Sequence, residues 1–208
     1  MVEIKEFIEG LRRLPRFTSA EVYEYLKSHP VQPDSLRPYL FFSQATYTRN
    51  LIFKNDLFEL LALCWESGQI SRIHNHRDQQ CWMAVPIGRL QAQDYRVLDR
   101  DPVKKTCRLV PSKSYPITAA EPAAVDTKEP VHQVVNRAEF GERAVSLHLY
   151  SKPFDSCEVY SLEKGNYCDV PLYYTSEYGK LCAGELALPA GAAPGLPFST
   201  TKTQRHES

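Results

Sequence analysis

Two histidines stand two residues apart in the segment SRIHNHRDQQCW, which covers residues 71–82. Residues i and i+2 of a β-strand point to the same face, so His74 and His76 can reach one ion. Two neutral imidazoles are costly to bury without partners, and imidazole is a common ligand of divalent transition metals. The pair therefore predicts a metal site. A third ligand must come from another strand, and the chain offers His132 in EPVHQVVN and His148 in VSLHLYS.

The other histidines favour simpler interpretations. A single strand histidine, such as His132 or His148 taken alone, is more typical of a hydrogen-bonded core or rim residue than of a ligand. His29 precedes Pro30 at an expected helix end, and His206 lies near the C-terminus, so both are expected in solvent. Only the paired spacing of residues 74 and 76 shifts the balance toward a metal.

The elements that must position these side chains change in kind near residue 45. Helical spacing of apolar residues predicts helices in VEIKEFIEGLRRL and TSAEVYEYLKSHP, the second with Thr18 and Glu21 in a capping-box arrangement, and a short helical piece in DSLRPYL. Two strands are then expected around a turn at Lys54-Asn55-Asp56. Short strand-like pieces follow: CWMAVPI, GRLQAQDYRVL, CRLVPSKSYPI, AAVDT, VHQVVNR, AVSLHLYS, SCEVYSL and VPLYYTS. About ten short strands after a small helical cap indicate an all-β barrel or sandwich.

Composition argues against several classes of function. The 25 basic and 25 acidic residues cancel and form no basic stripe, so neither nucleic acid nor an anionic membrane is an expected partner. No apolar run approaches the length of a membrane span, and the charged N-terminal stretch lacks the apolar run of a signal peptide. The six cysteines are scattered without a CxxC pair, which indicates mostly reduced thiols. A cytoplasmic protein is expected. No βαβ alternation or glycine-rich phosphate loop supports nucleotide chemistry.

Several motifs, taken in order, resemble the cysteine dioxygenase (type I) family of the cupin superfamily. They are YTRNL at 47–51, LCW at 63–65, IHNH at 73–76, Cys81, VHQVVN at 131–136 and AVSLHLYSKPFDSC at 144–157. The resemblance runs from about Tyr47 to Gly179 and implies a cupin-type small β-barrel (jelly-roll) with an N-terminal helical cap. We expect one cupin domain over 1–184, with a helical part at 1–45 and the barrel at 46–184. Residues 185–208, rich in Ala, Pro and Gly and then polar, are expected to be a loosely ordered tail.

The resemblance also implies a cofactor and a substrate. His74, His76 and His132 would bind Fe²⁺, and a neutral three-histidine set leaves room for an anionic ligand such as a thiolate. L-cysteine would chelate through its sulfur and amine, and O2 would oxidise it to cysteine sulfinic acid. Arg49 would hold the substrate carboxylate with support from Tyr47. Without the resemblance, an arginine in YTRNL reads more simply as a rim residue paired with a surface acid.

A second group of residues is implied to act beside the iron. Many cupins have a glutamate ligand where this chain has Gln80 and Cys81, and in the resembled family Cys81 and Tyr150 can form a thioether. Ser146, His148 and Tyr150 alternate along one expected strand, so all three should face the same side and form a hydrogen-bonded relay. His148 is thereby assigned beside the metal and not on it. The simpler reading of Cys81 is a small buried hydrophobic residue, and Cys157 is placed at the pocket mouth with a peripheral role.

Three positions depart from the family pattern. Lys152 follows Ser151 where the family often has proline, Gln80 stands where vertebrate-type enzymes have histidine, and Arg77 adds a charge beside the histidine pair. Two alternatives stay open: a dioxygenase for another small thiol such as 3-mercaptopropionate, and a non-catalytic metal-binding cupin sensor. Cys81 together with YTRN favours L-cysteine. A monomer is expected because no apolar helix face stands out for self-association.

Overall fold

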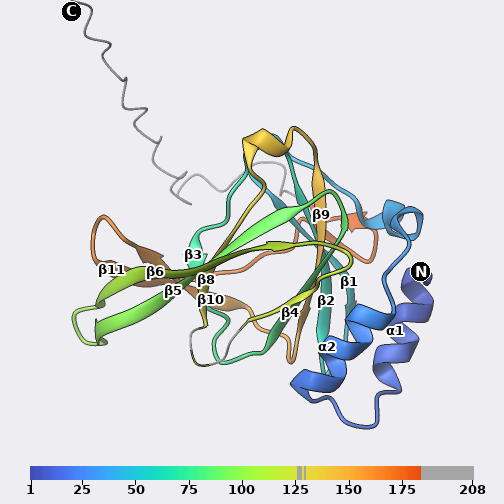
Figure 1. The fold of residues 1–208 in the computed structure, drawn as a ribbon, viewed down its shortest axis with the longest axis horizontal. Coiled ribbons are helices and arrows are strands. Elements are labelled where there is room, and N and C mark those ends of the chain that lie inside the picture. Colours follow the sequence, from blue (N-terminus) through green and yellow to red (C-terminus); the bar gives the residue numbers. More distant parts are fainter. Residues whose placement is uncertain (126–127, 129, 184–208) are drawn as a thin grey trace, which may run out of the picture.

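The computed structural model describes residues 1–125, 128 and 130–183. The expected C-terminal tail at 185–208 lies outside the described residues. Within the described part, two α-helices precede strands that form two sheets (Figure 1). No helix in this part is long and apolar enough to cross a membrane.

All three helical pieces that the sequence predicts are present in the helical segment. Helix α1 (Ile4–Arg12) buries one apolar face, and α2 (Ser19–Ser28) begins at Thr18, whose side chain accepts a hydrogen bond from the backbone N–H of Glu21. The third piece is a 3₁₀-helix, η1 (Pro33–Tyr39), and not an α-helix. Pro38 inside it has no N–H to donate, so a regular α-helical hydrogen-bond pattern cannot form there.

The strands form a seven-stranded sheet and a six-stranded closed barrel. The first has the order β13 (Lys180–Leu181), β12 (Ser176–Glu177), β1 (Thr48–Lys54), β2 (Glu59–Trp65), β9 (Ala144–Tyr150), β4 (Cys81–Ile87) and β7 (Ala123–Ala124). The second has the order β10 (Ser156–Ser161), β11 (Asn166–Pro171), β6 (Thr106–Ile117), β5 (Leu90–Asp101), β8 (Val131–Val135) and β3 (Ile73–His74), and η2 (Ala138–Phe140) joins β8 to β9. This architecture confirms the predicted all-β class, with a closed barrel and helices at the N-terminus.

Strands β2 and β9 are buried along their whole length because both faces of their sheet are covered. On β2, Leu60, Ala62 and Cys64 join the cluster that contains α1 and α2, while Leu61, Leu63 and Trp65 join the cluster on the opposite face. Figure 1 shows both helices on the outer side of this sheet, with α2 next to β2 and α1 farther out. The period of two along a strand therefore separates structural residues on the helix side from residues that face the barrel interior.

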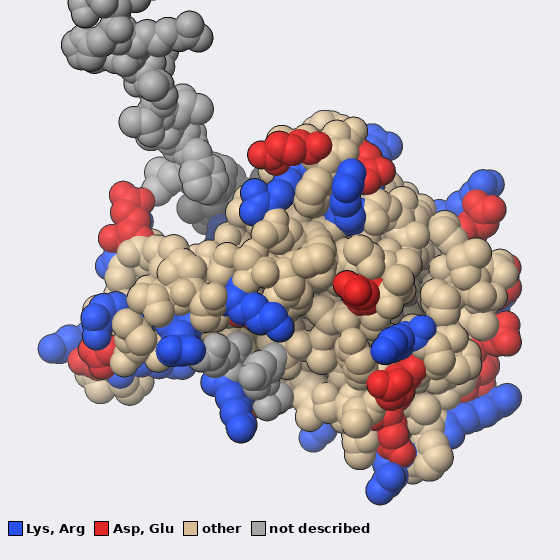
Figure 2. Space-filling model, in the orientation of Figure 1, with Lys and Arg blue, Asp and Glu red and all other residues tan. Residues whose placement is uncertain are grey.

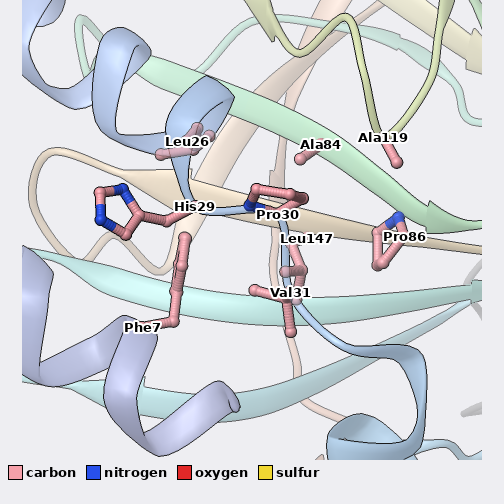
Figure 3. A pocket seen from close by; sticks show the side chains of 9 residues that line it. All are labelled: Phe7, Leu26, His29, Pro30, Val31, Ala84, Pro86, Ala119 and Leu147. Carbon is pink, nitrogen blue, oxygen red and sulfur yellow. The ribbon is translucent and has the colours of Figure 1, made fainter. Parts of the chain in front are cut away.

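An apolar cavity lies where the helical segment meets this sheet (Figure 3). It is lined by Phe7, Leu26, His29, Pro30, Val31, Ala84, Pro86, Ala119 and Leu147. His29 was expected in solvent, but it is half-buried, because its ring stacks on Tyr25 with the ring centroids 4.2 Å apart. On the face shown in Figure 2, basic and acidic side chains are interspersed.

Candidate metal centre

Three histidines from two segments of the chain converge inside the barrel. His74 on β3 and His132 on β8 are directly opposite in the antiparallel pairing of these strands. His76 lies beyond the end of β3, and its Nε2 atom is 3.2 Å from Nε2 of His132. One ring nitrogen from each of the three lies within 4.8 Å of the other two. The structure thus brings together all three histidines that were named as ligands.

The reason for this convergence differs from the one inferred from the spacing. Strand β3 ends at His74, so His74 and His76 do not share the face of one strand. The chain turns directly after His76, where Arg77 and Asp78 have φ angles of 51° and 65°, and the backbone N–H of Gln79 donates to the His76 carbonyl. The two imidazole planes are 83° apart. A turn, and not the pleat of a strand, aims the second histidine at the first.

Asn75, between the two histidines, fixes this turn to strand β10. Its Nδ2 donates to Oε2 of Glu158 at 2.7 Å and to the hydroxyl of Tyr160 at 3.1 Å, while its Oδ1 accepts from the backbone N–H of Glu158 at 3.2 Å. Glu158 is 5% exposed and also accepts from Arg100 at 2.6 Å. Burial alone would raise the pKa of Glu158, but the bonds from Tyr160, Asn75 and Arg100 outweigh it and lower the pKa. An ionised Glu158 therefore anchors the segment that carries the histidine pair.

The three histidines fit a bound cation. Nδ1 of His74 is 2.8 Å from the carbonyl of Arg72, to which it donates, so Nε2 carries the lone pair. Burial lowers the pKa of His74 to about 4 and the pKa values of His76 and His132 well below the ordinary value. Nδ1 of His76 and of His132 is buried without a hydrogen-bond partner. Three neutral imidazoles with converging nitrogens form a donor set suited to a divalent transition metal.

A chain of hydrogen bonds runs along the interior face of β9. The Nε1–H of Trp65 donates to Oγ of Ser146 at 2.9 Å, Ser146 Oγ lies 3.0 Å from Nε2 of His148, and Nδ1 of His148 lies 3.2 Å from the hydroxyl of Tyr150. Burial lowers the pKa of His148 to about 3, so the imidazole is neutral. When Ser146 donates to Nε2, the Nδ1–H of His148 donates to the Tyr150 oxygen. The phenol hydrogen is then free to point into the site.

Cys81 and Tyr150 lie side by side on adjacent strands. They are directly opposite in the antiparallel pairing of β4 with β9, a position that brings Cβ atoms to roughly 5 Å. Cys81 is 1% exposed and Tyr150 is 2% exposed. Burial raises the pKa of the Cys81 thiol, and a hydrogen bond with Tyr150 partly offsets the rise. Directly before Cys81, the backbone N–H of Gln80 donates to Oγ of Ser151 at 3.0 Å, and the backbone N–H of Ser151 donates to the Gln80 carbonyl at 3.0 Å. These two bonds hold the adjacent strand ends together.

Arg49 enters the same interior from β1. Its side chain is 13% exposed, and its Nε and Nη2 atoms are buried without hydrogen-bond partners. Burial raises the pKa of Tyr150 well above its ordinary value, and the charge of Arg49 partly offsets this rise. Burial lowers the pKa of His148, and the charge of Arg49 adds to this lowering, so the guanidinium acts on interior residues. Tyr47 stacks on Trp65 with ring centroids 4.3 Å apart. Tyr47 therefore supports the wall beside Arg49, and the reading of Arg49 as a rim residue is wrong.

Two further residues at this site had not been identified from the sequence. Glu59 is fully buried, and one of its oxygens lies 3.9 Å from Nη2 of Arg49. Tyr174 donates its hydroxyl hydrogen to the other oxygen at 2.7 Å. The strand FELLALCW does contain a signal for Glu59, because alternation from Leu61 and Leu63 puts a charged residue on the interior face. Cys157, placed at the pocket mouth, is 3% exposed on β10, and burial raises its pKa to about 11.

The fold and the histidine cluster define a β-barrel protein with a candidate metal site in its interior. The family profile described as "Cysteine dioxygenase type I" matches residues 2–163, and the chain belongs to this family. Cysteine dioxygenase type 1 of Danio rerio is 32% identical over 169 residues, covering 81% of this chain and 82% of the relative. The proteins of the same name from Rattus norvegicus and Homo sapiens are each 32% identical over 160 residues, covering 76% of this chain and 78% of each relative.

Solved structures overlap the chain only in part. A double-stranded beta-helix protein of Klebsiella pneumoniae has a TM-score of 0.41 at 13% identity and covers 66% of this chain and 88% of its own. A sugar phosphate isomerase from a cupin superfamily, from Silicibacter pomeroyi, has a TM-score of 0.35 at 19% identity and covers 55% of this chain and 68% of its own.

Proposed function

We propose that this protein is an iron-dependent dioxygenase that oxidises L-cysteine with O2 to cysteine sulfinic acid. The observation that carries the proposal is the neutral set of His74, His76 and His132 in the same interior as Arg49. The relatives named cysteine dioxygenase type 1 support it. In the overall reaction a thiolate and O2 give a sulfinate: sulfur is oxidised by four electrons, O2 is reduced by four, and both oxygen atoms are retained in the product.

The three histidines would hold the ferrous ion. When bound, the ion supplies coordination positions for a thiolate and an amine, and the redox chemistry that makes O2 reactive toward sulfur. Because the three imidazoles are neutral, they leave the positive charge of the ion uncompensated, which favours an anionic thiolate. The burial of His76 and His132, at 2% and 0% exposure, keeps water away from this position.

The remaining residues would orient the substrate. Arg49 offers Nε–H and Nη2–H to a carboxylate, an arrangement that its planar guanidinium suits. Ser146 and His148 fix the Tyr150 hydroxyl through the hydrogen bonds described above, so that Tyr150 can hold a proton near the reacting sulfur. Tyr47 would support the Arg49 side of the pocket through its stacking on Trp65.

Cys81 and Tyr150 would form a thioether between the cysteine sulfur and the tyrosine ring. Their opposed positions on β4 and β9 support this pairing. Bond formation would remove one hydrogen from the thiol and one from the ring, and O2 would take up both hydrogen atoms and be reduced to hydrogen peroxide. The bond should give a faster-migrating gel band and a mass loss of about two hydrogens. Cys81→Ser should abolish that band, and persistence of two bands would contradict the pairing.

The test of the proposed function is oxygen consumption by protein loaded with ferrous iron, together with identification of the product. L-cysteine should consume O2 and yield the sulfinate, and metal analysis of the protein as purified should find iron. A clear preference for 3-mercaptopropionate would replace the substrate. Metal binding without a sulfinate from any thiol would instead indicate a non-catalytic metal-binding protein.

The organisation of the chain belongs to the same proposal. We take residues 1–184 as one cupin domain, because α1, α2, β2 and β9 contribute to a single hydrophobic cluster. We also propose that it acts as a cytoplasmic monomer. Analytical ultracentrifugation of the purified protein should give one species of the mass of a single chain.

A further inference from the structure

Glu59 is a buried carboxylate for which the proposed reaction has no use. It lies at the start of β2 on the interior face, directly opposite Tyr150 in the pairing of β2 with β9. Its side chain is 0% exposed, and its Oε1 has no hydrogen-bond partner. A buried polar oxygen without a partner is unusual in proteins and calls for an explanation.

The positive charge of Arg49 gives one part of that explanation. A guanidinium stays protonated even when it is buried, so it needs a nearby negative charge. Within the described residues, Glu59 is the carboxylate paired with it, at 3.9 Å between Oε1 and Nη2. This separation is longer than a hydrogen bond. Glu59 therefore compensates the charge of Arg49 while leaving the Nε–H and Nη2–H donors unused.

A segment near the C-terminal end of the described chain contacts both residues. Tyr174 donates to Oε2 of Glu59 at 2.7 Å. The next residue, Thr175, makes two hydrogen bonds with the backbone of Arg49. Its backbone N–H donates to the Arg49 carbonyl at 2.7 Å, and its Oγ1 accepts from the backbone N–H of Arg49 at 3.3 Å. Ser176 Oγ donates to Asn50 at 2.9 Å. This segment lies outside residues 2–163, which the family profile matches.

We propose that Tyr174 holds Glu59 away from Arg49, so that Glu59 neutralises the guanidinium without occupying the donors that bind the substrate carboxylate. The inference rests on the proposed role of Arg49 in L-cysteine binding. Tyr174 and Glu59 are positioning residues in this scheme, since they act through Arg49. The substrate carboxylate replaces no existing hydrogen bond when it arrives, and its binding is stronger for that reason.

Removing the Tyr174 hydroxyl should turn Glu59 into a competitor of the substrate. In Tyr174→Phe, Oε2 loses its donor, and the carboxylate satisfies itself by forming hydrogen bonds with the guanidinium. Substrate must then displace an internal ion pair. We expect the dissociation constant of L-cysteine to rise about tenfold, which corresponds to about 1.4 kcal/mol. Glu59→Gln removes the competing charge, so adding Tyr174→Phe to it should change the constant less than twofold.

The experiment is an anaerobic binding titration of the iron-loaded protein with L-cysteine. Four proteins form a double-mutant cycle: the natural chain, Tyr174→Phe, Glu59→Gln and the double variant. Tyr173→Phe is the matched control, because it removes the same hydroxyl from the adjacent residue, which is 59% exposed. A tenfold loss in Tyr174→Phe that disappears in the Glu59→Gln background supports the proposal. Equal losses in both backgrounds, or no loss in Tyr174→Phe, would overturn it.

A second ligand separates this inference from a general loss of structure. Cysteamine has the thiol and amine of cysteine but no carboxylate, so its binding should be the same in Tyr174→Phe and in the natural chain. Equal weakening of both ligands would show that Tyr174 only stabilises the fold, and the proposal would be wrong. This comparison needs no Glu59 variant, so it holds even where Glu59→Gln does not fold. If the natural chain binds L-cysteine no better than cysteamine, Arg49 does not bind the carboxylate, which refutes the proposed substrate and with it the role of Tyr174. Failure in the variants alone, with the natural chain preferring L-cysteine, refutes only the role of Tyr174.

Discussion

Asn75→Ala is expected to weaken metal binding although Asn75 itself offers no ligand to the metal. The side chain makes three hydrogen bonds, two with Glu158 and one with Tyr160, at 2.7 to 3.2 Å. Together they hold the turn after β3, which aims His76 at His132. Alanine removes all three bonds at once and leaves the histidine side chains unchanged.

The magnitude follows from the kinds of bond that are lost. A hydrogen bond to an ionised group contributes about 1.5–3 kcal/mol, and a neutral one contributes about 0.5–1.5 kcal/mol. Because Asn75 is half-buried, water can replace some of the lost hydrogen bonds in the variant. We therefore expect the free energy of unfolding to fall by about 2–3 kcal/mol. Loss of residues that orient metal ligands typically lowers metal affinity by about 10- to 100-fold, and we expect a change in this range.

The assay combines urea unfolding of the metal-free protein with anaerobic competition for ferrous iron against a chromophoric chelator. Asn166→Ala is the control, because Asn166 lies exposed on the neighbouring strand β11, where such a change should stay within about 0.5 kcal/mol. Natural iron affinity in Asn75→Ala would refute the reasoning. It would show that the histidines converge without the bonds from the turn to β10.

Three other perturbations test separate parts of the structure. His132→Ala should remove one of three ligand nitrogens and abolish stoichiometric iron binding, while His29→Gln, which alters a histidine outside the cluster, should retain it in the same metal analysis. The pKa of Glu158 is lowered in the folded protein, so its contribution to stability is present above about pH 4.5 and is lost as the pH falls through the folded pKa. Glu158→Gln should therefore have a smaller free energy of unfolding at pH 7, measured by urea unfolding. On acidification, the variant should lose less stability than the natural chain does. Ser146→Ala removes the hydroxyl that bonds Nε2 of His148, so the imidazole no longer holds the Tyr150 hydroxyl in a fixed orientation. We expect kcat to fall about tenfold with little change in KM. An unchanged kcat would argue against the relay.

The amino-acid sequence by itself determined the class of fold and much of the site. Alternation along AVSLHLY is a local property of a strand, and it correctly placed Ser146, His148 and Tyr150 on one face, where hydrogen bonds now connect them. Thr18 and Glu21 correctly predicted the start of α2, because a capping hydrogen bond joins residues only three positions apart. The order of YTRNL, IHNH and SLHLYS pointed to the family because these motifs are short and contiguous.

The tertiary structure decided whatever depends on contacts between distant segments. The sequence put His74 and His76 on one strand face, but the turn that aligns them is held by Glu158, more than eighty positions later. Likewise, Tyr174 reaches Glu59 only because β12 pairs with β1, which brings the residues just before β12 close to the start of β2. Such contacts leave no periodic signal, because their partners meet through strand order and register, which a single sequence does not specify.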